Sequence, residues 1–431
     1  MNKKAFNLEL IAFLRNSPTP FHAVLNIRKE LEDAGYKELR ESNTWNCKRG
    51  GKYFVIRGGS SIAAFSLSPE RDFMGGFRMV GAHTDSPCLK LKPNSLRAKL
   101  GYQQLCAEVY GGVLMNPWFD RDLSLAGNVT IRKGNKFISL PLDFKRALAV
   151  IPSLAIHLDR EANSKRQINP QTMLFPIISL GNEADSNFEK ILQSQVRKEH
   201  KITGSYKIVG SELSLYDFNP PAVVGLKDEF IASARLDNLL SCFVGLRALL
   251  NSGSNQNQLL ICNDHEEVGS GSNLGARGTF LKALLERVLK PRNVSEVMPT
   301  SMLVSTDNAH GVHPNFPEKH DPDHLPLLNN GPVLKINQNQ AYATNSETGA
   351  VMNFLAKKEG INLQSFVSRN DMGCGSTIGP LTAMTVGVKT ADIGVPTFAM
   401  HSIREMAGTD DSYALYRLLK SFYNISSVEI N

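Results

Sequence analysis

The sequence predicts an α/β protein with three layers, helix on sheet on helix, whose chain is interrupted by a β-rich insertion. Downstream of Phe230, helical and extended segments alternate, which is typical of a largely parallel sheet covered on both faces. Between Lys92 and Phe230 the segments are short and β-like, with turn residues between them. The 431 residues also exceed what one core usually organises. We therefore expect a discontinuous domain of residues 1–91 and 231–431, and an inserted domain of residues 92–230.

The first 91 residues are expected to supply helices and then strands. Apolar residues recur at helical spacing from Asn7 to Asn16 and from Phe21 to Ala34. Strands are expected at 53–56, 61–66 and 77–80, and the last runs into His83. The pattern therefore places His83 at the end of a strand.

The remaining elements follow in order. In the insertion, residues 130–138 read as a β-hairpin around Gly134. Beyond Phe230 the expected elements are a helix at 237–250, a strand at 258–263, a helix after Gly278, a strand at 302–305, strands near Val333 and Phe366, a helix near Asn353, a strand near Val386 and a last helix at 412–422.

Composition excludes several functional classes. The net charge is +7, with the positive excess in residues 1–230, but there is no Arg-rich tail, so nucleic acid is not an expected partner. No window approaches the ~20 apolar residues of a membrane span, and Glu9 interrupts the apolar stretch of the first residues. Six cysteines without a CxxC pair predict free thiols. The cytoplasm is the expected compartment.

Acids and histidines stand at the expected ends of strands and helices. Zinc and other divalent ions are held by imidazoles and carboxylates, and α/β sheets bring such side chains together at strand ends. The candidates are His83, Asp237, Glu266, Glu267, Asp307 and His401.

Each local pattern has a plainer alternative. Asp85, two residues after His83, can accept the second ring N–H of that imidazole, or the triplet can be a capped turn. Of the adjacent acids Glu266 and Glu267, one can bind a metal ion while the other transfers a proton, or both can simply belong to a solvated face. In the loop from His313 to Pro326, His320 and His324 are expected to be solvated.

Seven ordered blocks resemble the aspartyl aminopeptidase family over nearly the whole chain. They are GAHTDSP (81–87), WFDRDL (118–123), ARLDN (234–238), EEVGS (266–270), DNAH (307–310), GCGSTIGP (373–380) and MHSIRE (400–405). The resemblance implies a phosphorylase/hydrolase-like metallopeptidase domain interrupted by a β-rich dimerisation domain. It also implies two divalent metal ions per subunit, usually zinc, with cobalt or manganese as substitutes.

The resemblance assigns roles to the candidates. His83 and Asp307 hold one ion, Glu267 and His401 hold the other, and Asp237 bridges them. Glu266 is then the general base, which takes a proton from the attacking water and passes it to the departing amine. The substrates it implies are peptides with a free N-terminus.

The resemblance also implies an assembly and a specificity. His157 matches a histidine that reaches the site of a neighbouring subunit, in dimers built into a dodecamer; the alternative is an ordinary histidine on a helix or strand face. Lys335 matches a lysine that faces the carboxylate of an acidic substrate side chain, with Tyr342 alongside it, whereas a solvated strand-end lysine is the alternative. His310 is also expected to bind the substrate. Ala341 departs from the family, which commonly has a basic residue there, and weakens this expectation.

Two competing functions remain at this point. A deacylase on the same metal site would cleave N-acyl amino acids and no peptides. A noncatalytic assembly protein would be expected to lack a ligand or the base, whereas all six positions are filled here.

Overall fold

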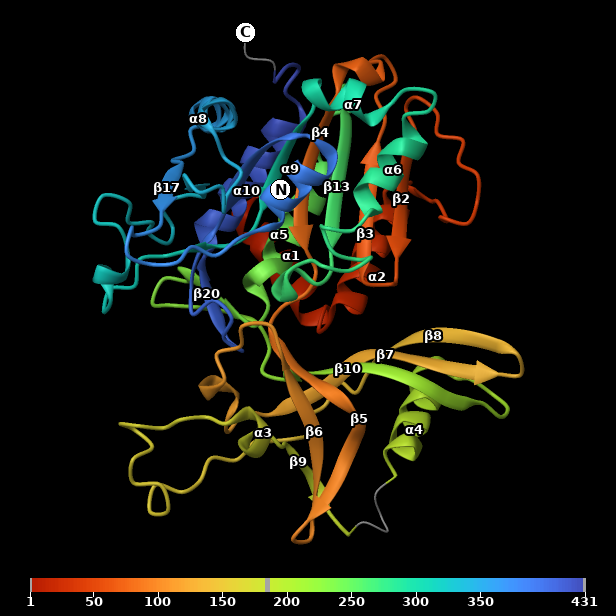
Figure 1. Cartoon of the computed structure of the whole chain (residues 1–431), viewed down its shortest axis with the longest axis vertical. Helices are drawn as coiled ribbons and strands as arrows, with labels where there is room; N and C mark the ends of the chain where they lie inside the picture. The colour runs from red at the N-terminus through yellow and green to blue at the C-terminus, as the bar shows by residue number, and fades with distance from the viewer. Residues whose placement is uncertain (1, 183–186, 429–431) are drawn as a thin grey trace. The chain divides into compact units, whose positions relative to one another are not determined.

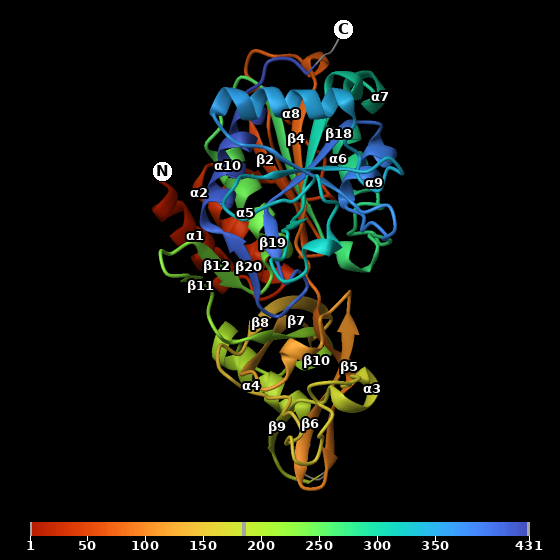
Figure 2. The same cartoon turned by 90° about the vertical axis from the view of Figure 1, so that its left-hand side faces the viewer.

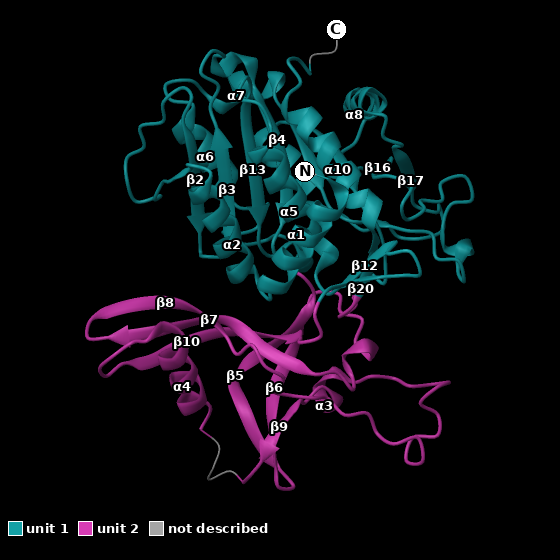
Figure 3. Ribbon diagram, turned by 180° about the vertical axis from the view of Figure 1, so that it is seen from behind, with its two compact units in different colours: residues 1–85, 221–400, 405–431 teal, residues 86–220, 401–404 magenta. Residues whose placement is uncertain are grey.

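A computed structural model describes residues 2–182 and 187–428, and the chain divides into two compact units (Figure 3). The first comprises residues 1–85, 221–400 and 405–431, and the second comprises residues 86–220 and 401–404. The sequence predicts an insertion from Lys92 to Phe230, whereas the long stretch of the second unit begins at Ser86 and ends at Pro220. The inclusion of residues 401–404 in the second unit was not indicated by any sequence pattern.

A nine-stranded mixed sheet forms the centre of the first unit. Its strands, in spatial order, are β1 (Lys37–Glu38), β2 (Lys52–Arg57), β3 (Ser61–Ser66), β13 (Asn257–Asn263), β4 (Phe77–His83), β14 (Met302–Thr306), β18 (Lys389–Gly394), β16 (Val333–Ile336) and β17 (Gln364–Val367). The four strands from β13 to β18 are parallel to one another. Their carboxyl ends therefore lie along one edge of the sheet.

Helices cover both faces of this sheet (Figures 1 and 2). One face carries α1 (Lys3–Asn16), α2 (Pro20–Asp33), α5 (Leu236–Leu250), α8 (Ser346–Glu359) and α10 (Thr409–Tyr423), and the other carries α6 (Phe280–Val288), α7 (Val294–Val297) and α9 (Ile378–Val386). Helix α5 packs on β4 and β13 and also against α1 and α10. This explains why its sequence is apolar nearly all round. The three-layer α/β prediction is confirmed.

A smaller sheet belongs to the same unit. Its strands, in spatial order, are β11 (Ala222–Val224), β12 (Phe230–Ser233), β20 (Glu405–Gly408), β19 (Pro396–Phe398) and β15 (Ala309–His310). The parallel pairing of β15 with β19 fixes the backbone at His310. Single-turn helices lie at η1 (Phe73–Gly75), η2 (Asn116–Trp118), η4 (Glu266–Val268), η5 (Met298–Thr300) and η6 (Pro317–Lys319).

The second unit is built on an antiparallel sheet. Its strands, in spatial order, are β8 (Lys136–Asp143), β7 (Leu123–Lys133), β10 (Lys207–Asp217), β5 (Cys88–Lys99), β6 (Tyr102–Tyr110) and β9 (Ile177–Leu180). The predicted hairpin is β7–β8. The unit also holds the short α3 (Pro170–Met173) and α4 (Phe188–His200). Helix α4 was missed, although Leu192 and Val196, one turn apart, form its buried face. In the described part of the chain, no helix has the length and apolarity that a membrane crossing requires.

The strand expected near Val386 was wrong. Residues Ile378–Val386 form α9, and the strand is β18, which begins at Lys389. Periodicity cannot separate a short apolar helix from a buried strand. The deciding signals are the ends: the Thr377 hydroxyl accepts the N–H of Gly379, and Gly387 closes the helix at φ 71°.

Asp411, in the first turn of α10, holds the loop that leads into β16. Its side chain is fully buried, and its two oxygens accept the N–H groups of Asn329 at 2.6 Å and of Gly331 at 2.8 Å. We expect Asp411→Ala to lower the free energy of unfolding by about 2–4 kcal/mol, because two buried donors lose their acceptor. Urea unfolding followed by circular dichroism measures this. Asp410→Ala, at an exposed neighbouring acid, is the matched control and should have a smaller effect. Equal effects would contradict the interpretation.

Candidate active site

Three neighbouring parallel strands bring the predicted acids and one histidine together. His83 is the last residue of β4, Glu266 and Glu267 lie in η4 just after β13, and Asp307 follows β14. In the sheet, β4 lies between β13 and β14. Side chains far apart in sequence therefore converge at one sheet edge, where α/β proteins place their sites.

Asp237 reaches the same place from the start of α5. Its backbone N–H donates to the Glu405 carboxylate at 3.0 Å, and Asn238 donates its side-chain amide to the carbonyl of Thr306 at 2.8 Å. The peptide bond between Asp237 and Asn238 is cis. Sequence reasoning assigned no role to Glu405, which no spacing pattern singles out.

The His83 imidazole is surrounded by carboxylates. Its Nε2 atom lies 3.4 Å from Asp237 Oδ1, 3.5 Å from Asp307 Oδ1 and 4.0 Å from Glu266 Oε2. In a tetrahedral zinc site with bonds of ~2.1 Å, donor atoms are ~3.4 Å apart. His83 Nε2 thus has ligand spacing to both Asp237 and Asp307, the three donor atoms lie within 4.8 Å of one another, and all three residues are buried.

A second set of donors overlaps the first. A carboxylate oxygen of Glu267 comes within 4.8 Å of donor atoms of His83 and Glu266, and also of Asp237. The nitrogen and oxygen donors present are those that zinc accepts. The remaining candidate, His401, belongs to the second unit, where its Nδ1 atom lies 3.0 Å from the carbonyl oxygen of Gly112.

The electrostatics of the cluster favour a bound cation. Burial raises the pKa of Glu266 to about 7 against the opposing effect of His83, and the carboxylates of Asp307, Asp237 and Asp85 add to the rise. Burial and the Asp237 charge likewise raise the pKa of Glu267 well above its ordinary value. Burial alone would lower the pKa of His83, but Glu266 and the hydrogen-bonded acids raise it. A divalent ion would offset this crowding of negative charge.

Asp85 connects the imidazole to the acids. Its Oδ1 atom lies 3.4 Å from His83 Nδ1, and the backbone carbonyl of Asp85 lies 3.2 Å from the same nitrogen. The Asp85 carboxylate also accepts the N–H groups of Glu266 and Glu267, each at 3.1 Å. Asp85 therefore fixes the backbone that carries both acids, a contact that the sequence did not reveal.

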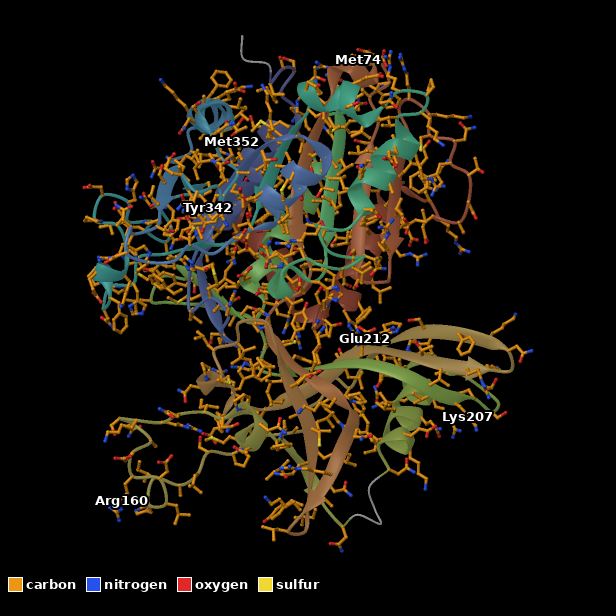
Figure 4. All side chains as sticks on the ribbon, viewed as in Figure 1. Met74, Arg160, Lys207, Glu212, Tyr342 and Met352 are labelled. Atoms are coloured by element: carbon orange, nitrogen blue, oxygen red, sulfur yellow. The ribbon has the colours of Figure 1, made fainter. Side chains whose placement is uncertain are left out.

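Lys335 and Tyr342 lie beside the cluster. The Lys335 side chain is buried, so a solvated strand-end lysine does not describe it. Its Nζ atom lies 3.4 Å from Asp307 Oδ2, 3.1 Å from the Asn308 carbonyl and 5.1 Å from the centre of the Tyr342 ring. Figure 4 labels Tyr342, on the stretch between β16 and α8. Burial is the main cause that raises the pKa of the Tyr342 hydroxyl.

The other predicted histidines lie in different surroundings. His157 is exposed in a turn of the second unit. His310 packs its ring edge-on to Phe366 at 5.7 Å, and desolvation, followed by the charge of Lys335, lowers its pKa. His324 lies at the surface, with its ring against Asp321. The solvated position expected for His320 was wrong, because this residue is buried between the backbone of His310 and the Phe366 ring.

A buried set of carboxylates and an imidazole at the strand ends of a three-layer α/β unit is characteristic of metal-dependent hydrolases. Comparison with known proteins agrees. Residues 13–423 match the family model described as aminopeptidase I zinc metalloprotease (M18). A probable M18 family aminopeptidase 2 of Pseudomonas aeruginosa is 54% identical over 424 residues, which cover 98% of this chain and 99% of the relative.

Solved structures show the same fold. A structure described as the Ape4 and Nbr1 complex superposes with a TM-score of 0.94 at 38% identity, covering 98% of this chain and 86% of that one. The mApe1 dodecamer of S. cerevisiae gives a TM-score of 0.85 at 27% identity, covering 98% and 96%. The chain belongs to the M18 family of zinc metallopeptidases, the aspartyl aminopeptidase family. It is a metalloaminopeptidase, as its sequence motifs predicted.

Proposed function

We propose that this aminopeptidase uses two divalent metal ions, most simply zinc, and prefers acidic N-terminal residues. His83 and Asp307 would hold one ion, Glu267 and His401 the other, and Asp237 would bridge them. The observation that carries this proposal is the convergence of the buried His83, Asp237 and Asp307 donors, in which His83 Nε2 has ligand spacing to both carboxylates. Asp237 lies near His83 and Asp307 and also near Glu267, which supports a bridging role for its carboxylate.

When bound, the ions would polarise the scissile carbonyl and make the attacking water more acidic. Glu266 is the acid best placed to move the proton. Its carboxylate is largely buried beside His83, and its backbone is held by Asp85. Glu266 takes the proton from water and gives it to the departing amine, so that one side chain serves both steps.

The acidic preference rests on positive charge near the cluster. Lys335 is an ammonium removed from water, next to Tyr342 and close to His310. A carboxylate on the substrate would add a partner to this charge, whereas a neutral side chain would not. Ala341 leaves the position before Tyr342 without a cation.

A panel of substrates tests this proposal. We expect kcat/KM for N-terminal Asp and Glu substrates to exceed that for Leu and Ala by at least about tenfold, since a charge-assisted contact of this kind discriminates by that order. Acetyl-Asp and acetyl-Leu, offered in parallel, should remain intact. Preference for Leu would contradict the acidic specificity. Cleavage of the N-acyl amino acids without cleavage of peptides would instead indicate a deacylase.

We also propose a homo-oligomer of dimers, in which the second unit contributes to dimerisation and His157 completes a neighbouring site. The dodecamer of the S. cerevisiae relative and the exposed Leu154, Ile156 and Leu158 around His157 support this. Sedimentation should show an assembly larger than a monomer.

Hybrid assemblies test the role of His157. Co-refolding inactive His157→Ala and Glu266→Gln chains should recover part of the activity, because mixed interfaces pair an intact His157 with an intact Glu266. His200→Ala, at another histidine of the second unit, is the control and should remain active alone. A fully active monomer would contradict the proposal.

A further inference from the structure

Asp392, within β18, is a fully buried acid that does not belong to the donor sets around His83. Both of its carboxylate oxygens are held by other segments. Oδ1 accepts the Thr377 hydroxyl and Oδ2 accepts the Ala343 N–H, each at 2.6 Å. Asp392 therefore joins the central sheet to the N-cap of α9 and to the segment that carries Tyr342.

A glycine makes the space for this carboxylate. Gly379 lies in the first turn of α9, and a Cβ atom there would come within 2.3 Å of Asp392 Oδ1 and 2.5 Å of Oδ2. Position 379 therefore accepts no side chain while the carboxylate stays in place. The Thr377 hydroxyl in turn accepts the Gly379 N–H at 3.3 Å. The first turn of α9 thus fixes where the Asp392 charge lies.

Lys335 lies directly opposite Asp392. The two residues are paired in the antiparallel register of β16 and β18, so their side chains leave the same face of the sheet. Burial raises the pKa of Asp392, and the charge of Lys335 is the first effect that opposes this rise. The Asp392 carboxylate is therefore a counter-charge for a buried ammonium.

The same ammonium contacts Asp307, a proposed metal ligand. Lys335 Nζ lies 3.4 Å from Asp307 Oδ2, whereas Asp307 Oδ1 is the oxygen that lies 3.5 Å from His83 Nε2. The two Asp307 oxygens therefore have different partners. An ammonium beside a ligating carboxylate weakens its attraction for a cation, and a second carboxylate beside that ammonium offsets the effect.

We propose that Asp392 is a positioning residue for the metal site, which acts through Lys335 on Asp307. This role rests on the proposed function, in which Asp307 is a ligand, and it does not depend on the acidic preference. Asp392 draws the ammonium towards its own carboxylate and limits how much of the positive charge falls on Asp307. The Asp307 Oδ1 atom then retains its negative charge for a cation.

Asp392→Asn tests this proposal, because it removes the charge and keeps the size. The amide oxygen can accept the Ala343 N–H, and the amide nitrogen can donate to the Thr377 hydroxyl. Competition of the full-length holoenzyme with a zinc chelator measures the affinity. The dissociation constant of at least one zinc equivalent should rise about tenfold, as expected when a ligand loses an outer partner. Gly379→Ala, which displaces the carboxylate without changing it, should weaken zinc binding in the same direction.

A double-mutant cycle with Lys335→Met separates positioning from packing. Because Asp392 acts through the ammonium, Asp392→Asn should have little further effect on zinc affinity in the Lys335→Met background. Lys335→Gln gives a second version of the cycle if the methionine variant does not fold, which circular dichroism shows. Asp411→Asn is the matched control, because Asp411 is another fully buried acid that accepts two backbone N–H groups. It should lower the free energy of unfolding and leave zinc affinity unchanged.

The outcomes are distinguishable. A wild type that binds no zinc, or Asp307→Ala with full zinc content, overturns the proposed metal site itself. Unchanged zinc affinity in Asp392→Asn overturns only the role of Asp392. The role is also overturned by a loss of equal size with and without Lys335, or by an equal loss in Asp411→Asn, because either result shows a general structural effect. Weaker zinc binding that is confined to chains containing Lys335 supports the proposal.

Discussion

Metal-free protein is expected to lose peptide hydrolysis by a factor of at least ~10³, and zinc, cobalt or manganese is expected to restore it. The cluster around His83 consists mainly of carboxylates, which cannot polarise a carbonyl in place of an ion. The measurement is kcat/KM after chelation and after titration with zinc, alongside the metal content per subunit. Activity should level off near two equivalents.

Variants of single histidines sharpen this test. His83→Ala should lose at least one equivalent of metal, because its Nε2 atom is central to the buried donor set. His324→Ala should keep both, because this histidine lies at the surface against Asp321. Circular dichroism must show that the stripped protein stays folded. Full activity in folded, metal-free protein would exclude the proposed chemistry.

Glu266→Gln should reduce turnover by ~10² to 10⁴ while leaving the metal content unchanged, because an amide cannot accept the proton of the attacking water. The substitution preserves size, and the backbone N–H of residue 266 can still donate to Asp85. The measurement is kcat together with bound metal. KM is expected to change much less than kcat.

Glu286→Gln is the matched control for this loss. Glu286 is an exposed acid on α6, so turnover should not change. If Glu266→Gln lost metal as well as turnover, Glu266 would be a ligand. Wild-type turnover in Glu266→Gln would mean that another residue is the base.

The layered fold was predictable because the main elements have strong local patterns. The apolar run that ends at His83 and the apolar face from Leu236 to Leu250 lie within single strands or helices. The segment at Val386 was expected in a strand but lies in helix α9, because a short apolar segment has a similar residue pattern in a helix and in a strand. The site was harder to predict from the sequence, because residues 83, 237, 267 and 307 share no sequence period. They come together only through the order of the strands in the sheet.

The interrupted path of the chain through the central sheet has a consequence for biosynthesis. Strand β4 and His83 leave the ribosome before the second unit, while the neighbouring strands β13 and β14 are made only after it. At ~5–20 residues per second, β4 waits roughly ten to forty-five seconds until both strands that flank it have been made. During that interval its apolar residues and unpaired backbone are exposed in the nascent chain. The second unit, by contrast, has nearly all of its chain available as one continuous stretch, so its sheet can form while the larger unit is still incomplete.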